Sequence, residues 1–459
     1  MRAWFESLIP AAPLSRRARW RIWVLLGVFL AFYGYTLNRA AFQQPGKGDL
    51  DVYLRAAWAA REGKSLYQIT DPHGWHYLYP PLLATLMIPL ADAPPEAAPE
   101  SKTNTLPYWV SVTIWYWLGV ACILASVHMV ASALEDTGAA RGAPPPPKYS
   151  QGWWGLRLLP ILLTLFFAGD GLGRGQSTPI LLLCISGCGA AILRGRSLRA
   201  GLWLGTAAIV KLFPAYLLIY PLWRRDKRFL AGAAASIVIG ILLPVAIMGP
   251  SASLLAYREF VGDRLLGEAS GGGDPAVAEE LHGTNSRIQS FEYMLYDMVH
   301  PYRETRAPQP PGEYFLAHIA LSALLTGGAL WAMRRRGDRL AEFLFFAALV
   351  QLVVPILPVS RPHYYVFGIL VLAGLYAAEW PRRQGLWAGW PVAAAAIAYL
   401  VAGILDGVDQ PQALDFGLAT FAALALGGLG LWEARRRAKG TEPVIASRDK
   451  VPAGINTVP

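Results

Sequence analysis

The sequence is poor in charged residues. Only 16% of its 459 residues are Asp, Glu, Lys or Arg, while 54% are hydrophobic, and a soluble domain usually carries about 25% charged residues. So little charge cannot cover the surface of a soluble protein of this size. The apolar residues also form long uncharged runs separated by short basic segments, as a bilayer requires, because each span must satisfy its own backbone hydrogen bonds. We therefore expect an all-α polytopic membrane protein.

Cysteine is scarce as well, and a repeat is lacking. The three cysteines, Cys122, Cys184 and Cys188, each lie within an apolar run. This placement predicts neither a disulfide framework nor a metal cluster, and we expect the three thiols to pack as small hydrophobes. No internal repeat is strong enough to indicate the inverted halves common among secondary transporters.

Acidic residues are outnumbered by basic ones, 31 to 41. In a soluble protein this excess would raise the question of nucleic acid, but here the basic residues gather at the ends of apolar runs, as the positive-inside rule predicts for cytoplasmic loops. The main clusters are Arg16, Arg17, Arg19 and Arg21; Arg224, Arg225, Lys227 and Arg228; Arg334 to Arg336; Arg382 and Arg383; and Arg435 to Arg437 with Lys439. We read the charge as topology and expect no nucleic-acid partner.

The apolar runs predict twelve spans. They cover residues 22–37, 77–91, 107–134, 153–168, 179–193, 200–223, 229–248, 314–333, 340–358, 363–378, 386–405 and 413–432. With basic ends inside, both termini are cytoplasmic and two long loops, residues 39–76 and 249–312, lie outside. The first run lacks a small-residue cleavage site, so it is read as a retained signal anchor. Residues 1–440 are predicted to form a single transmembrane domain, and residues 441–459 a disordered cytoplasmic tail.

One part of this topology conflicts with the charge rule. Strict alternation of spans places Arg194, Arg196 and Arg199 outside. We therefore expect that a run in this half is re-entrant. The candidates are residues 77–91, which carry three prolines, and residues 200–223, since broken helices are tolerated only where they line a cavity.

The first outer loop carries the leading candidate for chemistry. From Leu50 onward, its apolar residues fall on one helical face, which predicts a short amphipathic helix on the membrane surface. Asp49, at the start of this helix, is either an N-cap or a general base at the bilayer surface. Asp51 points in another direction on a helix, so at most one of the two carboxylates should act. Further along, His73 and His76 lack a close carboxylate ligand, and we expect no metal site.

Several basic residues could bind an anion. Lys211 lies within a predicted span and could reach a phosphate or extend its amine to the headgroups. Arg174 follows a Gly-rich segment and could bind phosphate or pair with Asp170. Arg361 and His363 could bind an anion together or belong to an interfacial aromatic belt with one anchoring arginine. The glycines around Arg174 do not form a phosphate loop, because no strand precedes them and no Gly-Lys-Ser/Thr follows.

Four local patterns occur together in one order. They are Gly48-Asp49-Leu50-x-Val52-Tyr53 with Gly63-x-x-x-Tyr67 and Tyr79-Pro80-Pro81; Gly175-Gln176; Ala200-Gly201 leading to Lys211-x-x-Pro214; and Pro358-Val359-Ser360 leading to His363. In these patterns the chain resembles glycosyltransferase family 87, the polyprenyl-phosphate-mannose-dependent mannosyltransferases of the GT-C superfamily. Two departures concern the donor sugar: the family's Asn-Gln-Ser in the second long loop is here Asn285-Ser286, with Gln289-Ser290 nearby, and Arg361 replaces an aromatic residue.

The resemblance implies a GT-C-like bundle that transfers a hexose, namely mannose, with inversion. The donor would be a polyprenyl-phosphate sugar, the acceptor a hydroxyl of a glycan or glycolipid, and the site the outer face of the plasma (inner) membrane. No cofactor is expected beyond this lipid-linked co-substrate, membrane lipid is a partner, and we expect a monomer. The alternatives are a secondary transporter or flippase of a lipid-linked or anionic substrate, and a non-catalytic assembly protein.

The same resemblance suggests roles for individual residues. Asp49 would be the general base and His363 would stabilise the leaving phosphate. The donor phosphate would be bound by Lys211, Arg361 and Arg174. The substrate would also contact Asp51, Tyr53, Tyr79, Gln176 and Asn285.

Overall fold

The computed structural model describes residues 15–43, 48–72, 74–103, 105–137, 145–267, 288–302, 306–307, 309–379, 390–407 and 417–439. Within these ranges the chain is helical apart from turns, loops and one isolated bridge between Thr70 and His76, so the prediction of an all-α protein is confirmed. Asn285, His73 and the predicted tail lie outside the described residues.

The helices have the following bounds. They are α2 (Arg16–Gln43), α3 (Asp49–Arg61), α4 (Pro81–Leu86), η1 (Ile88–Leu90), η2 (Pro99–Lys102), α5 (Tyr108–Asp136), α6 (Gln151–Leu163), α7 (Leu165–Gly173), α8 (Thr178–Leu193), α9 (Ser197–Val210), η3 (Phe213–Leu218), α10 (Ile219–Arg224), α11 (Lys227–Met248), α12 (Pro250–Glu259), η4 (Phe260–Gly267), α14 (Phe291–Val299), α15 (Gly312–Ala332), α16 (Arg339–Ile356), η6 (Pro362–Phe367), α17 (Gly368–Glu379), α18 (Trp390–Gly407) and α20 (Leu418–Lys439).

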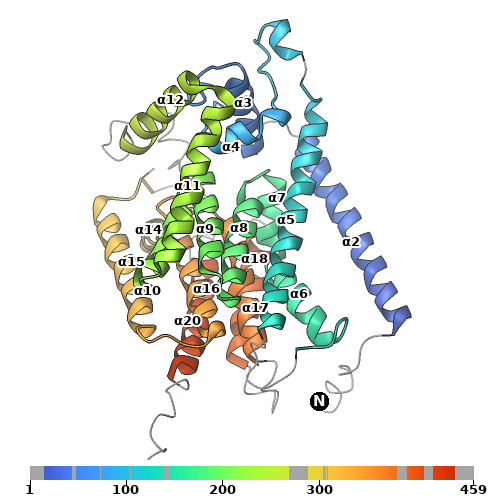
Figure 1. Ribbon diagram of the computed structural model, residues 1–459, viewed down its shortest axis with the longest axis vertical. Coiled ribbons are helices and arrows are strands. Elements are labelled where there is room, and N and C mark those ends of the chain that lie inside the picture. The colour runs from blue at the N-terminus through green and yellow to red at the C-terminus, as the bar shows by residue number, and fades with distance from the viewer. Residues whose placement is uncertain are drawn as a thin grey trace, which may run out of the picture.

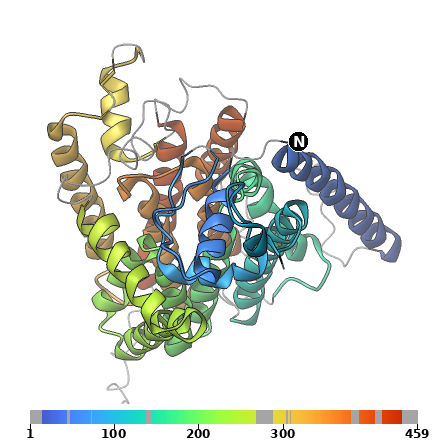
Figure 2. The same ribbon diagram turned by 90° about the horizontal axis from the view of Figure 1, so that it is seen from above.

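Long helices form a bundle with smaller helices gathered at one end. Figure 1 shows α3, α4 and α12 together at the top, so the two long loops of the sequence meet at the same end of the bundle. Among the described residues, four helices are long and apolar enough to cross a membrane: α5, α11, α15 and α16. Helices α6 and α7 add a fifth span if this pair, bent by 59°, is one. Helix α2 lies at the edge of the bundle (Figure 2), and its Trp20, Leu25 and Val28 are exposed, as suits a lipid-facing helix.

Arginine ion pairs tie together the opposite end of the bundle. Arg194, which follows α8, pairs with Asp136 at the end of α5 (2.6 Å). Arg224, at the end of α10, pairs with Glu342 at the start of α16 (2.8 Å), and Arg339 Nη1 donates to the Leu193 carbonyl (3.5 Å). The ends of α8 and α10 therefore both lie beside the start of α16.

These contacts resolve the conflict between span alternation and charge. Helix α9 starts from the arginine-rich end and stops at Val210, Lys211 adopts an extended conformation, and η3 with α10 brings the chain back to Arg224. Residues 200–223 thus form a re-entrant hairpin, which places Arg194, Arg196 and Arg199 at the same end as Arg224. Residues 77–91 also do not form a span, because only α4 and η1 are helical there and both are too short to cross. The count of twelve spans is not confirmed.

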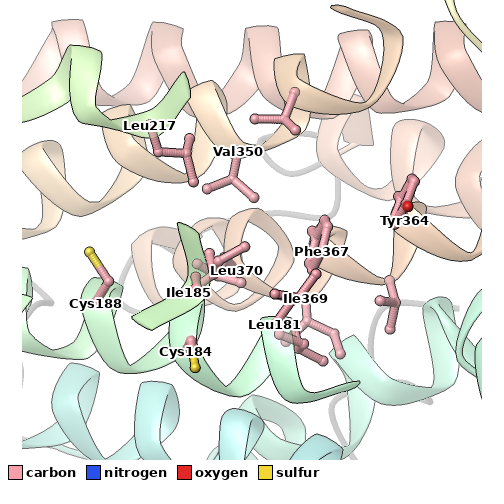
Figure 3. Packing of buried hydrophobic residues seen from close by; sticks show 14 of the residues in the cluster. Leu181, Cys184, Ile185, Cys188, Leu217, Val350, Tyr364, Phe367, Ile369 and Leu370 are labelled. Atoms are coloured by element: carbon pink, nitrogen blue, oxygen red, sulfur yellow. The ribbon is translucent and has the colours of Figure 1, made fainter. Parts of the chain in front are cut away.

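Beneath the upper elements, α8, η3, α16 and α17 share an apolar core. Figure 3 shows Leu181 and Ile185 of α8 near Ile369 and Leu370 of α17, with Cys184 and Cys188 on the same helix as Leu181 and Ile185. All three cysteines are buried and unbridged, so their prediction as small hydrophobes is confirmed. This core supports the segments that carry Lys211 and His363.

The re-entrant hairpin predicts a labelling pattern. In a variant whose native cysteines are replaced by alanine, single cysteines at Arg196 and Lys227, both exposed, should react with a membrane-impermeant maleimide from one side only. A cysteine at Glu100, exposed in η2 at the other end, should react from the opposite side. Labelling of positions 196 and 100 from the same side of intact vesicles would contradict the hairpin.

The arginine network predicts unequal effects on stability. The Arg224 and Glu342 side chains are 5% and 15% exposed, whereas those of Arg194 and Asp136 are 23% and 59% exposed. Arg224→Ala leaves a buried carboxylate without its partner and should destabilise the protein by about 3–5 kcal/mol, while Arg194→Ala should cost no more than about 1 kcal/mol. Thermal unfolding in detergent measures both, and equal effects would contradict the assignment of Arg224 as the buried tie.

Candidate active site

Asp49 is the first residue of α3, and it does not cap the helix. The N-cap is the extended Gly48, with no side-chain cap hydrogen bond, so the N-cap alternative for Asp49 is wrong. The helix is also not a surface helix, since every residue from Leu50 to Ala60 is buried. Burial of its polar residues is offset by partners on neighbouring segments. Arg55, for example, pairs with Asp92 (3.3 Å). The carboxylate of Asp49 therefore sits on a rigid, packed element.

Two glycines let α3 approach the turn between α7 and α8. A Cβ on Gly48 would lie 2.6 Å from the carbonyl oxygen of Arg174, and one on Gly175 would lie 2.5 Å from Cβ of Leu50. Gly175 also has a positive φ of 65°, which favours glycine. Trp115 locks the turn by donating from Nε1 to the Gly175 carbonyl (2.8 Å). The backbone at Gly48-Asp49 therefore packs directly against the turn that contains Gly175-Gln176.

A group of tyrosines surrounds Lys211. Its Nζ donates to the hydroxyl of Tyr79 (3.1 Å) and lies 4.3 Å and 5.1 Å from the ring centroids of Tyr79 and Tyr364. Tyr53 also donates to the Tyr79 hydroxyl (3.2 Å). Burial raises the pKa of Tyr53 and of Tyr79 well above the usual value, and the Asp49 charge adds to the rise. The Tyr79 oxygen thus accepts two donors and keeps its own proton for a third partner.

Helix α7 contributes a carboxylate to the site. Asp170 accepts from Nε of Arg174 (2.7 Å), so the predicted alternative for Arg174, a salt bridge with Asp170, is present. The second oxygen of Asp170 lies 3.6 Å from Nδ1 of His363. His363 is a buried residue of η6. The centroid of its ring lies 4.4 Å from that of Tyr364, and the two rings pack edge to face.

The Asp49 carboxylate is the charge that influences the cationic groups of the site. It acts electrostatically on Lys211, Arg361 and His363, which come from three other segments of the chain. In the part of the chain that the structure describes, neither the Asp49 carboxylate nor the Arg361 guanidinium closes an ion pair. Both residues are half-buried, and charged groups gathered in this way from several segments mark a candidate functional site.

Two more of the predicted residues, Gln176 and Asp51, have different surroundings. Gln176 is buried beside Gly175, and its Oε1 has no hydrogen-bond partner among the described residues. Asp51 faces away from Asp49, with Tyr108 and Asp92 as neighbours. The sequence prediction did not assign a role to Asp170, although its spacing of four from Arg174 on one helix was a usable signal.

The second long loop also reaches the site. The backbone N–H of Gln289 donates to the carbonyl of Ser360 (2.9 Å), next to Arg361, and Tyr293 of α14 lies within electrostatic range of Arg361. The described residues contain no group of three His, Cys, Asp or Glu side chains able to hold a metal ion. The site thus combines the Asp49 carboxylate, which closes no ion pair among the described residues, with several cations, and this suits proton abstraction beside an anionic leaving group.

Comparison with known proteins identifies the family. The model of glycosyltransferase family 87 matches residues 77–360, which hold Tyr79, Gln176 and Lys211, with Asp49 and His363 outside its ends. A relative from Mycobacterium tuberculosis, named a polyprenol-phosphate-mannose-dependent alpha-(1-2)-phosphatidylinositol mannoside mannosyltransferase, is 28% identical over 396 residues (84% of this chain, 82% of the relative). A protein of the same name from Mycolicibacterium smegmatis is 25% identical, covering 82% of this chain and 79% of the relative.

Solved structures show a weaker likeness. The structure of ArnT from Cupriavidus metallidurans bound to undecaprenyl phosphate covers 91% of this chain and 78% of its own, with a TM-score of 0.43 and 14% identity. The apo state of ArnT from the same organism gives a TM-score of 0.36 at 12% identity, covering 90% of this chain and 78% of its own. Because the family model spans more than half of this multi-pass membrane chain, the chain belongs to glycosyltransferase family 87 and is a membrane glycosyltransferase.

Proposed function

We propose that this protein transfers mannose from a polyprenyl-phosphate donor to a hydroxyl of a glycan or glycolipid acceptor at the outer membrane face, with inversion. The observation that carries the proposal is the convergence of Asp49, Lys211, Arg361 and His363, with the carboxylate facing cations that it does not neutralise. The names of both mannosyltransferase relatives support the donor and the glycolipid class of acceptor.

In the proposed reaction, the acceptor oxygen attacks the anomeric carbon of the donor and its proton passes to Asp49. The bond between this carbon and the phosphate oxygen breaks, and its electron pair stays on the phosphate. Lys211, Arg361 and His363 bind the charge that grows there, which lowers the barrier because preorganised charges stabilise the transition state without reorganising. The proton of the Tyr79 hydroxyl is available to the same phosphate or to the sugar.

The carboxylates available among the described residues support inversion. A retaining transfer needs a second carboxylate as nucleophile close to the first. Asp170 is engaged by Arg174 and faces His363, and Asp51 faces Tyr108, so Asp49 is the carboxylate left for proton transfer. A single displacement with one base inverts the anomeric centre.

The outer face follows from the charge asymmetry of the fold. Arg194, Arg224 and Arg437 gather at one end of the bundle, and such clusters lie on the cytoplasmic side. Asp49 and both long loops are at the other end (Figure 1). We therefore infer a plasma (inner) membrane protein with cytoplasmic termini and an outer active site, acting as a monomer without a cofactor.

The proposal predicts that the purified protein in lipid, given a radiolabelled polyprenyl-phosphate mannose and a glycolipid acceptor, releases polyprenyl phosphate and labels the acceptor. Asp49→Asn should lower turnover by about 10²- to 10⁴-fold, since general base catalysis contributes about this much, while donor binding persists. Asp136→Asn, a carboxylate at the cytoplasmic end, is the matched control and should keep wild-type turnover.

The identity of the base is contradicted if Asp49→Asn retains near wild-type turnover. Failure of the wild-type protein to turn over mannose while it uses another polyprenyl-phosphate sugar would overturn the donor sugar alone. The anomeric configuration of the labelled product, compared with that of the donor by NMR, tests inversion separately.

The cationic side of the site predicts a different kinetic change. Lys211→Met removes a charge that binds the phosphate in the ground state and more strongly as it leaves, so kcat should fall about 10²-fold or more and the donor KM should rise. Lys102→Met, an exposed lysine near the same end of the protein, should change neither constant. An unchanged kcat for Lys211→Met would remove this lysine from the leaving-group site.

A further inference from the structure

Asp170 contacts two cations of the site, and no role has been assigned to it so far. Its Oδ1 accepts from Nε of Arg174 at 2.7 Å, and its Oδ2 lies 3.6 Å from Nδ1 of His363. One oxygen of the Asp170 carboxylate is thus bonded to Arg174, and the other faces the imidazole of His363. Helix α7 packs so closely against η6 that a Cβ added to Gly171, the next residue, would lie 3.5 Å from Cβ of His363.

The imidazole of His363 needs such a partner. Its ring is 2% exposed, and neither nitrogen has a hydrogen-bond partner among the described residues. An unpaired buried polar group is costly, and 3.6 Å is longer than a hydrogen bond. Catalytic hydrogen bonds are often this long before the substrate binds and shorten in the complex, so Nδ1 is placed to complete one with Asp170.

The charges around His363 come from four segments. Burial has the largest effect and disfavours the protonated ring, as does Lys211 after α9, whereas Asp170 on α7 and Asp49 at the start of α3 favour it. The ring of Tyr364 of η6 packs edge to face with that of His363. Asp170 is the carboxylate within ion-pair distance. The charge and orientation of the ring therefore depend on Asp170 more than on any other of these groups.

We propose that Asp170 is a positioning residue that accepts Nδ1–H of His363 and so counters the effect of burial, which allows the ring to hold a second proton on Nε2 and to direct it at an oxygen of the leaving phosphate. This inference rests on the proposed function. In the transfer step His363 keeps its proton, the electron pair of the broken carbon–oxygen bond goes to the phosphate, and Nε2–H donates a hydrogen bond to the charge that develops. Arg174 then acts by holding Asp170, through the contact that it already makes.

The proposal is tested with Asp170→Asn, which keeps the shape of the side chain and removes its charge. We expect kcat to fall about 10- to 100-fold, as is typical when a partner that orients a histidine is lost, with a smaller change in donor KM. The alkaline limb of the kcat–pH profile should move to lower pH by about one unit or more, because the nearby negative charge that favoured the protonated ring is gone. Asp136→Asn, at the other end of the bundle, should keep the wild-type profile.

Two further variants separate positioning from a purely structural role. Asp170→Glu retains the charge and should keep the wild-type alkaline limb even if kcat falls. In a His363→Asn background, Asp170→Asn should cause little further loss, because its effect passes through the ring. An alkaline limb shared by Asp170→Glu and Asp170→Asn, or full additivity in the double variant, would overturn the proposal.

The outcome is distinguishable from failure of the proposed function. If the wild-type protein releases no polyprenyl phosphate from any polyprenyl-phosphate sugar, the function itself fails. If the wild-type protein turns over and Asp170→Asn matches it in kcat and pH profile, only the role of Asp170 is overturned. Should Asp170→Asn not yield folded protein by size-exclusion chromatography, the Asp170→Glu profile decides the matter, since loss of the alkaline limb there contradicts the proposal.

Discussion

The site depends on the Asp49 carboxylate being held near three cationic groups without forming an ion pair with any of them. Asp49 acts on Lys211, Arg361 and His363, yet it closes no salt bridge with them in the described chain. If these groups were on flexible loops, they would move together and form direct ion pairs, because pairing reduces the free-energy cost of removing each charge from water. Asp49 is held back by the contact of Gly48 with Arg174 and of Gly175 with Leu50, and Lys211 is held by Tyr79.

The same constraint explains why the helices are broken near the site. Lys211 is an extended residue between α9 and η3, and the hairpin carries it from the arginine-rich end of the bundle to Tyr79. Non-helical backbone within a membrane is tolerated only where protein or a polar cavity surrounds it. The break therefore presents a lysine at the level of the donor phosphate while α9 itself remains a regular helix packed on α11.

Packing of the extramembrane elements completes the site. Tyr67 donates to the carbonyl of Tyr79 (2.8 Å), and Arg264 of η4 donates to the carbonyl of Tyr67 (2.6 Å). The first long loop is thus braced by the second, and Gln289 anchors the chain beside Ser360. Both long loops support the tyrosines and cations that line the site, which gives a physical reason for their unusual length.

The sequence by itself determined the membrane class, the helical content, the buried cysteines and the segments that carry the candidate residues, because hydrophobic runs and flanking charges act locally and need no partner. It also indicated that the segments around residues 77–91 and 200–223 were irregular. Only the tertiary structure decided that Asp49 starts a buried helix, that residues 200–223 turn back, and that Asp170 joins Arg174 to His363. These features arise from contacts between residues far apart in the chain, where burial and pairing override the pattern of any single segment.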